Sequence, residues 1–194
     1  MYPLAARGEA TASGRSITPL TALSQPASIE RVFDIRTGTS GGIDVPLAES
    51  RWNAIVIHHS GSPVCTAATI DRRHRAAGLM GMGYHFVIGN GRRMGDGELH
   101  IGDRWAGQAP GAHVAGEAGL TLNRSAIGIC LVGDGNRTEF TRPQSQKLIE
   151  LVSRLCERLD IPPSRVFMHR DVAHTTSPGR LFPEAGLRAY LSGR

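Results

Sequence analysis

The sequence has few cysteines and no long apolar run, and each shortage limits what the protein can be. Only Cys65, Cys130 and Cys156 occur, so at most one pair could form, and a fold held together by several disulfides is excluded. No apolar stretch reaches the roughly 18 residues that a membrane-spanning helix needs. The first residues, MYPLAARGEATASG, lack a continuous apolar core, so we expect no secretory signal and no membrane span.

Long runs of one charge are also missing. The 22 basic and 17 acidic residues give a net charge of +5, which could favour anionic partners such as cell-wall polymers, nucleic acid or anionic lipid. The basic residues are scattered, however, with only short pairs such as Arg72-Arg73 and Arg92-Arg93. Without a basic stripe we expect no nucleic-acid partner.

Composition changes along the chain and divides it in two. Residues 1 to about 30 are rich in Ala, Ser, Thr, Pro and Gly and show no periodicity, as in a flexible arm. Regular patterns begin near Asn53, after the loose stretch TGTSGGIDVP. We therefore predict a flexible N-terminal arm over residues 1–49 and a single domain over residues 50–194, and we expect a monomer.

Short apolar segments bounded by turn residues predict the strands. The run AIVIHHS at 54–60 is rich in β-branched residues and is followed by Ser-Gly-Ser-Pro, which is typical of a buried strand. Asn90-Gly91 is a strong hairpin turn signal, so the segments on either side of it should pair. Further strands are predicted at 84–88, 98–102, 125–132 and 165–169.

The clearest helix prediction is 142–159, where apolar residues recur at helical spacing. Thr141 and Gln144 fit a capping box, and Pro143 lies in the first turn, where its missing N–H costs nothing. Shorter helices are predicted at 66–77, closed by a glycine, and at 183–191. This mixture of strands and helices predicts an α/β fold with a central mixed β-sheet flanked by helices.

Histidines close two of the predicted strands. His58 and His59 end the first strand, and His169 ends the last one. A rigid strand that ends in histidine can present a ligand at a cleft, and a catalytic zinc usually takes three protein groups and one water. Taken singly, each histidine is more often a surface residue or a satisfied core residue, so the residues alone leave both interpretations open.

Four motifs in a fixed order are more specific than any single histidine. They are IVIHHS, then GYHFVIGNG, then GAHVAG with NRSAIGICLVG, then MHRDVAHTTSPGRLFP. In sequence and order they resemble the type-2 N-acetylmuramoyl-L-alanine amidase and peptidoglycan recognition protein family, which includes the phage lysozyme-type amidases. The resemblance covers roughly residues 50 to 190 and implies the α/β fold of that family.

The resemblance also implies a catalytic machinery. His58 and His169 match two zinc ligands, Tyr84 matches a tyrosine beside the metal-bound water, and Thr175 matches the residue that steadies the oxyanion. In such a site the metal lowers the pKa of water and polarises the amide carbonyl between N-acetylmuramic acid and L-alanine. A preorganised hydroxyl then stabilises the negative charge that develops in the transition state.

Three further residues match positions that line or support the substrate groove, namely His59, His113 and Asn123. Direct contact with substrate and a purely structural role are both open for them. The implied partner is peptidoglycan or a muramyl peptide. Such a substrate implies the cell envelope or secretion, although no export signal is legible, so localisation stays open.

One residue departs from the family pattern. The third zinc ligand is usually a Cys eight residues after the second His, in a Cys-Pro-Gly turn, and here that position is Ser177. A serine hydroxyl is almost never ionised near neutral pH and is a poor zinc ligand. His174 and Asp171 are the nearest substitutes in sequence, although His174 is not a family position and Asp171 is better suited to bracing the loop.

Two functions therefore remain. The first, which we favour, is a zinc-dependent peptidoglycan amidase acting in cell-wall catabolism, because a pure receptor has no need of Tyr84 and Thr175. The alternative is a peptidoglycan recognition protein on the same scaffold, with weak or absent Zn2+ and impaired catalysis because of Ser177. Ser177 would also be present if an inactivating substitution had been introduced at this position. A basic structural or nucleic-acid protein is a more distant third interpretation.

Overall fold

A computed structural model describes residues 43–46 and 51–193. One five-stranded sheet in the order β3-β2-β4-β1-β5 carries the single domain. Its strands are β1 (Ala54–His59), β2 (Phe86–Ile88), β3 (Leu99–Ile101), β4 (Ala126–Leu131) and β5 (Val166–Met168). β1 lies parallel to β4 and β5, β2 lies parallel to β4, and β3 lies antiparallel to β2. The predicted central mixed sheet is confirmed.

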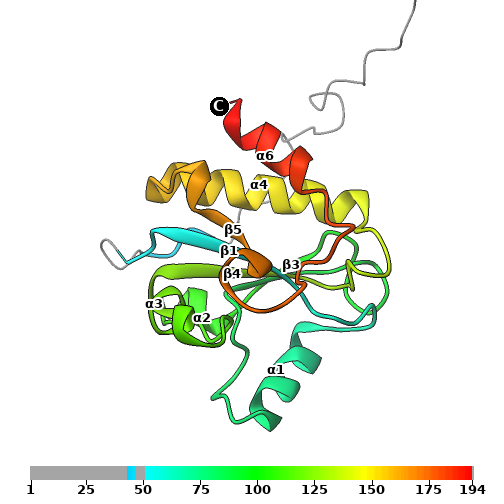
Figure 1. The fold of residues 1–194 in the computed structure, drawn as a ribbon. Coiled ribbons are helices and arrows are strands. Elements are labelled where there is room, and N and C mark those ends of the chain that lie inside the picture. The colour runs from blue at the N-terminus through cyan, green and yellow to red at the C-terminus, as the bar shows by residue number, and fades with distance from the viewer. Residues whose placement is uncertain (1–42, 47–50, 194) are drawn as a thin grey trace, which may run out of the picture.

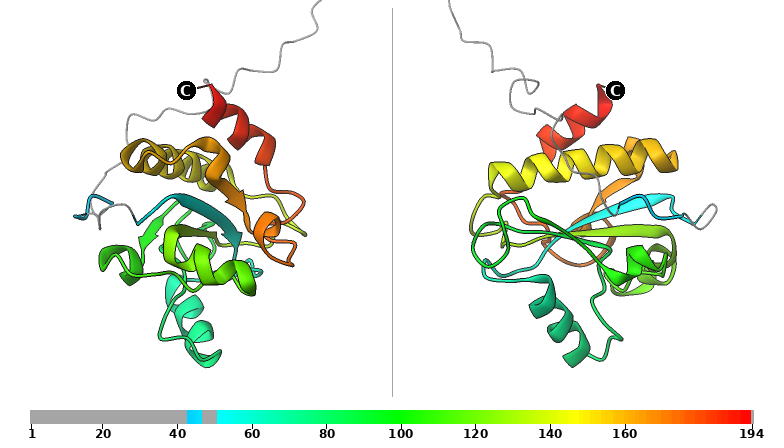
Figure 2. Two further views of the ribbon diagram at one scale, coloured as in Figure 1. Left: turned by 60° about the vertical axis from the view of Figure 1, so that its left-hand side comes forward. Right: turned by 180° about the vertical axis from the view of Figure 1, so that it is seen from behind.

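Helices cover both faces of this sheet (Figure 1). The long helix α4 lies across one face with α6 beyond it, and α1, α2 and α3 lie on the other side, as the two further views also show (Figure 2). The helices are α1 (Ala67–Ala76), α2 (Asp103–Ala106), α3 (Glu117–Ser125), α4 (Arg142–Leu159), α5 (His169–Val172) and α6 (Glu184–Ser192), with a 3-10 turn at Pro163–Arg165.

Helix α4 begins and ends where its sequence predicts. The Thr141 side chain accepts a hydrogen bond from the Gln144 N–H, and the Gln144 side chain accepts one from the Thr141 N–H. The Gln144 amide also donates to the carbonyls of Ile88 and Val132, so the capping residue fixes the helix to the last residue of β2 and to the residue that follows β4. The apolar face of α4 is buried against the sheet, and burial of each such side chain contributes about 1.5–3 kcal/mol.

Side chains of β1 alternate between the two faces, as a strand requires. Ile55 and Ile57 belong to the core that includes α4, whereas Ala54 and Val56 pack on the opposite side with residues of α3. His58 continues the second series. The strand period therefore directs His58 towards the face that carries α1 and α3.

His169 lies one step beyond the strand that we expected it to end. The last strand stops at Met168, and His169 is the first residue of α5. The reason is a local cap, because the Asp171 carboxylate accepts a hydrogen bond from the Met168 N–H at 2.8 Å. The strand prediction for 165–169 was therefore too long by a residue at each end.

Short helices were missed where apolar periodicity is weak. α3 begins after Gly116 without a side-chain cap and contains only one buried residue, Gly119. α2 and α5 have four residues each, too few for a helical period to show. The strands predicted at 84–88 and 98–102 are three residues long, and Tyr84 precedes β2.

Residues 43–46, which we assigned to the N-terminal arm, pack on the domain. The Ile43 side chain is 6% exposed, and its carbonyl accepts hydrogen bonds from the Trp105 indole at 3.1 Å and from Arg158 at 2.7 Å. Asp44 forms ion pairs with Arg154 and Arg158. The rest of the predicted arm lies outside the described residues, so its flexibility stays a prediction.

Two expectations from the sequence concern membrane-spanning helices and cysteines. None of these helices combines enough length and apolarity to cross a bilayer. Cys65 and Cys130 are buried free thiols, and Cys156 is half-buried.

Candidate active site

The carboxyl ends of parallel strands bring the predicted site residues together. β1, β4 and β5 are parallel neighbours, so the residues that end them meet at one edge of the sheet. The rings of His58 and His169, 111 positions apart in sequence, have centroids 4.2 Å apart. The Tyr84 ring lies 5.1 Å from that of His58. The structure therefore places three of the predicted residues in one cluster.

A chain of hydrogen bonds fixes the protonation state of His58. His113 Nε2 lies 3.2 Å from the Ala126 carbonyl, which can only accept, so Nε2 carries the hydrogen. His113 Nδ1 is then an acceptor, because burial lowers the pKa of His113 to about 3 and keeps the ring neutral. It lies 3.0 Å from His58 Nε2, which must therefore donate. As a result, Nδ1 of His58 carries a free lone pair.

Two buried ring nitrogens in this cluster have no hydrogen-bond partner in the described part of the chain, namely His58 Nδ1 and His169 Nε2. Buried polar atoms in proteins are almost always paired, so two unpaired nitrogens on neighbouring rings suggest an absent partner. Burial, followed by the charges of neighbouring histidines, lowers the pKa of His58 well below its ordinary value. Burial and the charge of His59 lower the pKa of His169. Neutral imidazoles of this kind are metal ligands.

Ser177 lies between the two histidine segments. Its Oγ accepts a hydrogen bond from the N–H of His59 at 3.0 Å, and its carbonyl accepts one from the N–H of Arg170 at 2.8 Å. Its side chain is only 4% exposed. The serine thus contacts the main chain beside His58 and beside His169, and its role as the third-ligand position stays a prediction from the sequence resemblance.

His59 holds the turn that contains Ser177. Its Nδ1 accepts a hydrogen bond from the Gly135 N–H at 3.0 Å, so Nε2 carries the hydrogen and donates to the Pro178 carbonyl. Burial lowers its pKa, although Asp134 opposes that effect. Both ring nitrogens of His59 therefore join the loop after β4 to the Ser177 turn, which gives His59 a structural role.

Asn123 has a similar internal role. Its Oδ1 accepts from the N–H groups of His113 and Val114 at 2.9 and 3.0 Å, and its Nδ2 donates to the Val114 carbonyl at 2.8 Å. Asn123 therefore fixes the main chain of His113, whose own ring is only 7% exposed. His59, His113 and Asn123, the three residues expected at the substrate groove, all form hydrogen bonds to other groups of the protein. Their direct contact with substrate stays a prediction.

Tyr84 is a buried phenol with a partner that the sequence did not reveal. Its hydroxyl is hydrogen-bonded to the thiol of Cys130, which faces His58 across the β1–β4 pair. Burial, followed by Cys130, raises the pKa of Tyr84 well above its ordinary value. The phenol therefore stays protonated at neutral pH, and it donates its hydrogen to the Cys130 sulfur while its oxygen can still accept a hydrogen bond. The alternation of ICLVG places Cys130 on this face, but nothing in the pattern paired it with Tyr84.

The remaining predicted residues lie in the loop after α5. Thr175 is half-buried, and its Oγ1 accepts from the Ser177 N–H at 3.2 Å, which leaves the hydroxyl hydrogen for another acceptor. Asp171 caps α5 through the Met168 N–H, so it braces the loop as expected. His174 is exposed. Neither Asp171 nor His174 supplies a third metal ligand, since no three His, Cys, Asp or Glu side chains form a metal-holding group among residues 43–46 and 51–193.

The donor set can be compared with what Zn2+ requires. The two unpaired imidazole nitrogens are suitable ligands, and their rings are neighbours. The third position offers a neutral hydroxyl where zinc prefers an anionic thiolate or carboxylate. The residues fit zinc through two nitrogens, and they fit it weakly at the third position.

Solved structures with the same fold define the class of this protein. Drosophila PGRP-LB has a TM-score of 0.56 at 24% identity, over 73% of this chain and 83% of that one. Bumblebee PGRP-SA has a TM-score of 0.56 at 22% identity, over 72% of this chain and 81% of that one. These likenesses show that the sheet and its helices form the fold shared by type-2 amidases and peptidoglycan recognition proteins.

The family follows from the sequence itself. The sequence model of the N-acetylmuramoyl-L-alanine amidase family, Amidase_2, matches residues 48–180, more than half of the chain. The chain belongs to this family. It is similar to the N-acetylmuramoyl-L-alanine amidase LysC from Clostridium intestinale URNW, with a TM-score of 0.64 and 32% identity over 76% of this chain and 91% of that one. No curated protein sequence gives a match.

Gly128 makes room for the His113 ring, and this generates a first prediction. A Cβ at Gly128 would lie 2.5 Å from His113 Cδ2, so Gly128→Ala should lower the free energy of unfolding by about 1–3 kcal/mol. Chemical denaturation followed by circular dichroism measures the change. Gly186→Ala is the control, since no atom lies within 4 Å of its new Cβ in α6, and stability should rise by about 0.5–1 kcal/mol. Equal stability of Gly128→Ala and wild type would contradict the packing described.

Proposed function

We propose that the protein is a zinc-dependent peptidoglycan amidase that hydrolyses the amide between N-acetylmuramic acid and the L-alanine of the stem peptide. The observation that carries the proposal is the pair of unpaired nitrogens, His58 Nδ1 and His169 Nε2, on adjacent buried rings. Family membership and the likeness to LysC support it. In this proposal the two nitrogens hold Zn2+, and the partner is peptidoglycan or a muramyl peptide.

Zn2+ supplies the Lewis acidity that an amide carbonyl and an attacking water both need. The chain's own residues then have separate tasks. His113 holds His58 in the tautomer that presents Nδ1, through the 3.0 Å contact between the rings. Tyr84, protonated and buried beside His58, orients the water through its hydroxyl oxygen, which accepts a hydrogen bond while its hydrogen points to Cys130. Thr175 donates its hydroxyl hydrogen to the oxygen on which negative charge develops.

The alternative function rests on one residue. Ser177 offers a hydroxyl at the third ligand position, and a site that holds zinc weakly can still bind a sugar peptide without cutting it. Structures of similar fold are of a Drosophila PGRP-LB variant with tracheal cytotoxin and of PGRP-LCa and PGRP-LCx with the same ligand. A recognition protein on this scaffold is therefore the second candidate.

Replacement of His58 separates catalysis from binding. His58→Ala removes the lone pair at Nδ1, so release of free stem peptide from muramyl peptide should fall by at least about 1000-fold. Sedimentation with insoluble peptidoglycan should change little, because the groove remains. Peptide release is followed by liquid chromatography with mass spectrometry, and His100→Ala, at an exposed histidine of β3, is the control. Equal turnover by His58→Ala and wild type would exclude the zinc mechanism.

Restoration of the family's thiol tests the third position. Ser177→Cys should tighten zinc binding by roughly 100-fold and raise turnover, because a thiolate replaces a neutral hydroxyl. Metal content after dialysis and titration against a zinc-binding dye measure the affinity. Ser153→Cys adds a comparable buried thiol on α4, on the other side of the sheet, and should leave zinc affinity unchanged. If Ser177→Cys retains no more metal than the parent, Ser177 is not at the ligand position.

Replacement of His113 tests the hydrogen-bond chain. His113→Ala removes the acceptor for His58 Nε2–H, so zinc affinity should fall by about 10- to 100-fold while the ligands themselves remain. His85→Ala is matched to it, because His85 is also buried and accepts from the Gly128 N–H but does not contact His58. Calorimetric titration with Zn2+ and thermal unfolding are measured for both variants. If both variants lose zinc affinity equally, His113 contributes through packing alone and not through its hydrogen bond to His58.

A further inference from the structure

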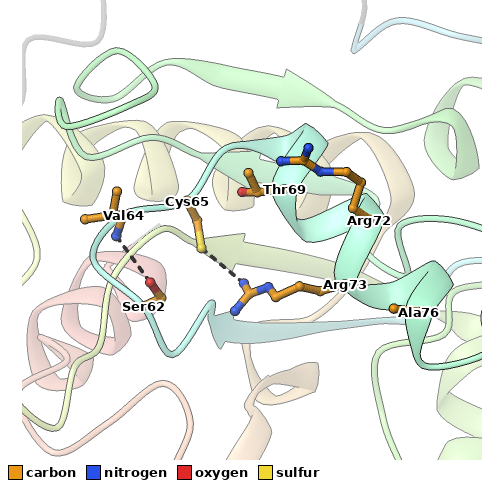
Figure 3. Close-up of a pocket in the computed structure, with 7 residues that line it drawn as sticks. All are labelled: Ser62, Val64, Cys65, Thr69, Arg72, Arg73 and Ala76. Carbon is orange, nitrogen blue, oxygen red and sulfur yellow. Dashed lines mark hydrogen bonds between the residues drawn. The ribbon is translucent and has the colours of Figure 1, made fainter.

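A pocket opens close to the segment that follows His58. A pocket of about 320 Å3 opens between helix α1 and the loop that joins it to β1, with Ser62, Thr69, Arg72 and Arg73 in its wall (Figure 3). In this close-up both arginine side chains extend from α1 along the pocket, and Arg73 reaches towards the loop. None of the residues assigned to catalysis above lines it.

The pocket carries two positive charges that no carboxylate of residues 43–46 or 51–193 neutralises. Arg73 donates to Cys65 Sγ at 3.1 Å and approaches the Ser60 carbonyl at 3.5 Å, and both of these are neutral acceptors. No acidic side chain lines the pocket. The acidic residue of α1, Asp71, is already paired with Arg75 at 2.7 Å and accepts from the Met82 N–H.

The pocket adjoins the catalytic cluster. Ser60, which Arg73 approaches, follows His58 by two residues, and two residues of extended chain span about 7 Å. Arg73 donates to Cys65 Sγ, and Cys65 packs in the same buried cluster as Cys130 and Tyr84, so Arg73 lies on the Tyr84 side of the site. A substrate bound at His58 can therefore extend into the pocket.

We propose that this pocket binds a free carboxylate of the stem peptide through Arg72 and Arg73, with the Ser62 hydroxyl as a further donor. The proposal rests on the proposed function, since it names the part of that substrate which the pocket receives. A guanidinium presents N–H donors in a fixed fork that matches both oxygens of a carboxylate. Ser62 Oγ accepts from the Val64 N–H, which leaves its hydrogen for an anion.

A pair of uncleavable ligands tests the pocket on the full chain as purified. Both are muramyl tripeptides whose first amide is replaced by a methylene-amine, and they differ only in whether the free carboxylates are left as acids or converted to amides. Calorimetric titration gives the dissociation constants. For the wild type, amidation should weaken binding by about tenfold. In Arg72→Gln/Arg73→Gln, the acid should bind about tenfold more weakly than to wild type, and amidation should have no further effect.

The control variant removes two arginine charges at a different exposed site. Arg92→Gln/Arg93→Gln removes the same two charges from an exposed pair at the β2–β3 turn and should bind the acid as the wild type does. If amidation weakens the wild type and the pocket variant equally, the carboxylate binds elsewhere and the pocket assignment is overturned while the proposed function stands. If the wild type binds neither ligand, the proposed function and the pocket both fall.

Discussion

The hydrogen bond between His113 and His58 is the interaction on which the candidate site depends. It starts at a main-chain carbonyl of β4, passes through one neutral ring and ends by fixing which nitrogen of a second ring is free. The glycine opposite Val56 provides the space for it, because any side chain at position 128 would meet the His113 ring. The sheet therefore determines the tautomer as well as the position of His58.

The long elements could be predicted from sequence because their signals are local and repeated. The helix at 142–159 was predicted to the residue, since its cap and its apolar face agree. The short helices could not be predicted, because four residues show no period. His58 and His169 were paired by motif order, and only the parallel arrangement of β1 and β5 explains in physical terms why they meet.

Other features of the site depend on contacts between distant segments and leave no mark in the sequence. The sequence predicts no role for Cys130, yet its thiol is the hydrogen-bond partner of Tyr84. His59 reads as a groove residue, yet both of its nitrogens join main-chain groups of two loops. Such roles are decided by which atoms face each other after folding, so residue type and spacing do not show them. Ser177 is the opposite case, since the family motif and the chemistry of a hydroxyl already distinguish it in the sequence.

The segment at residues 43–46 has a practical consequence for the limits of the domain. The family match begins at residue 48, but the Ile43 carbonyl is the acceptor for the buried indole of Trp105 and for Arg158. A protein shortened to the matched region would leave that indole N–H without an acceptor and uncover the end of α4. The folding unit thus extends beyond the homologous region, and a boundary drawn from homology alone would cut through it.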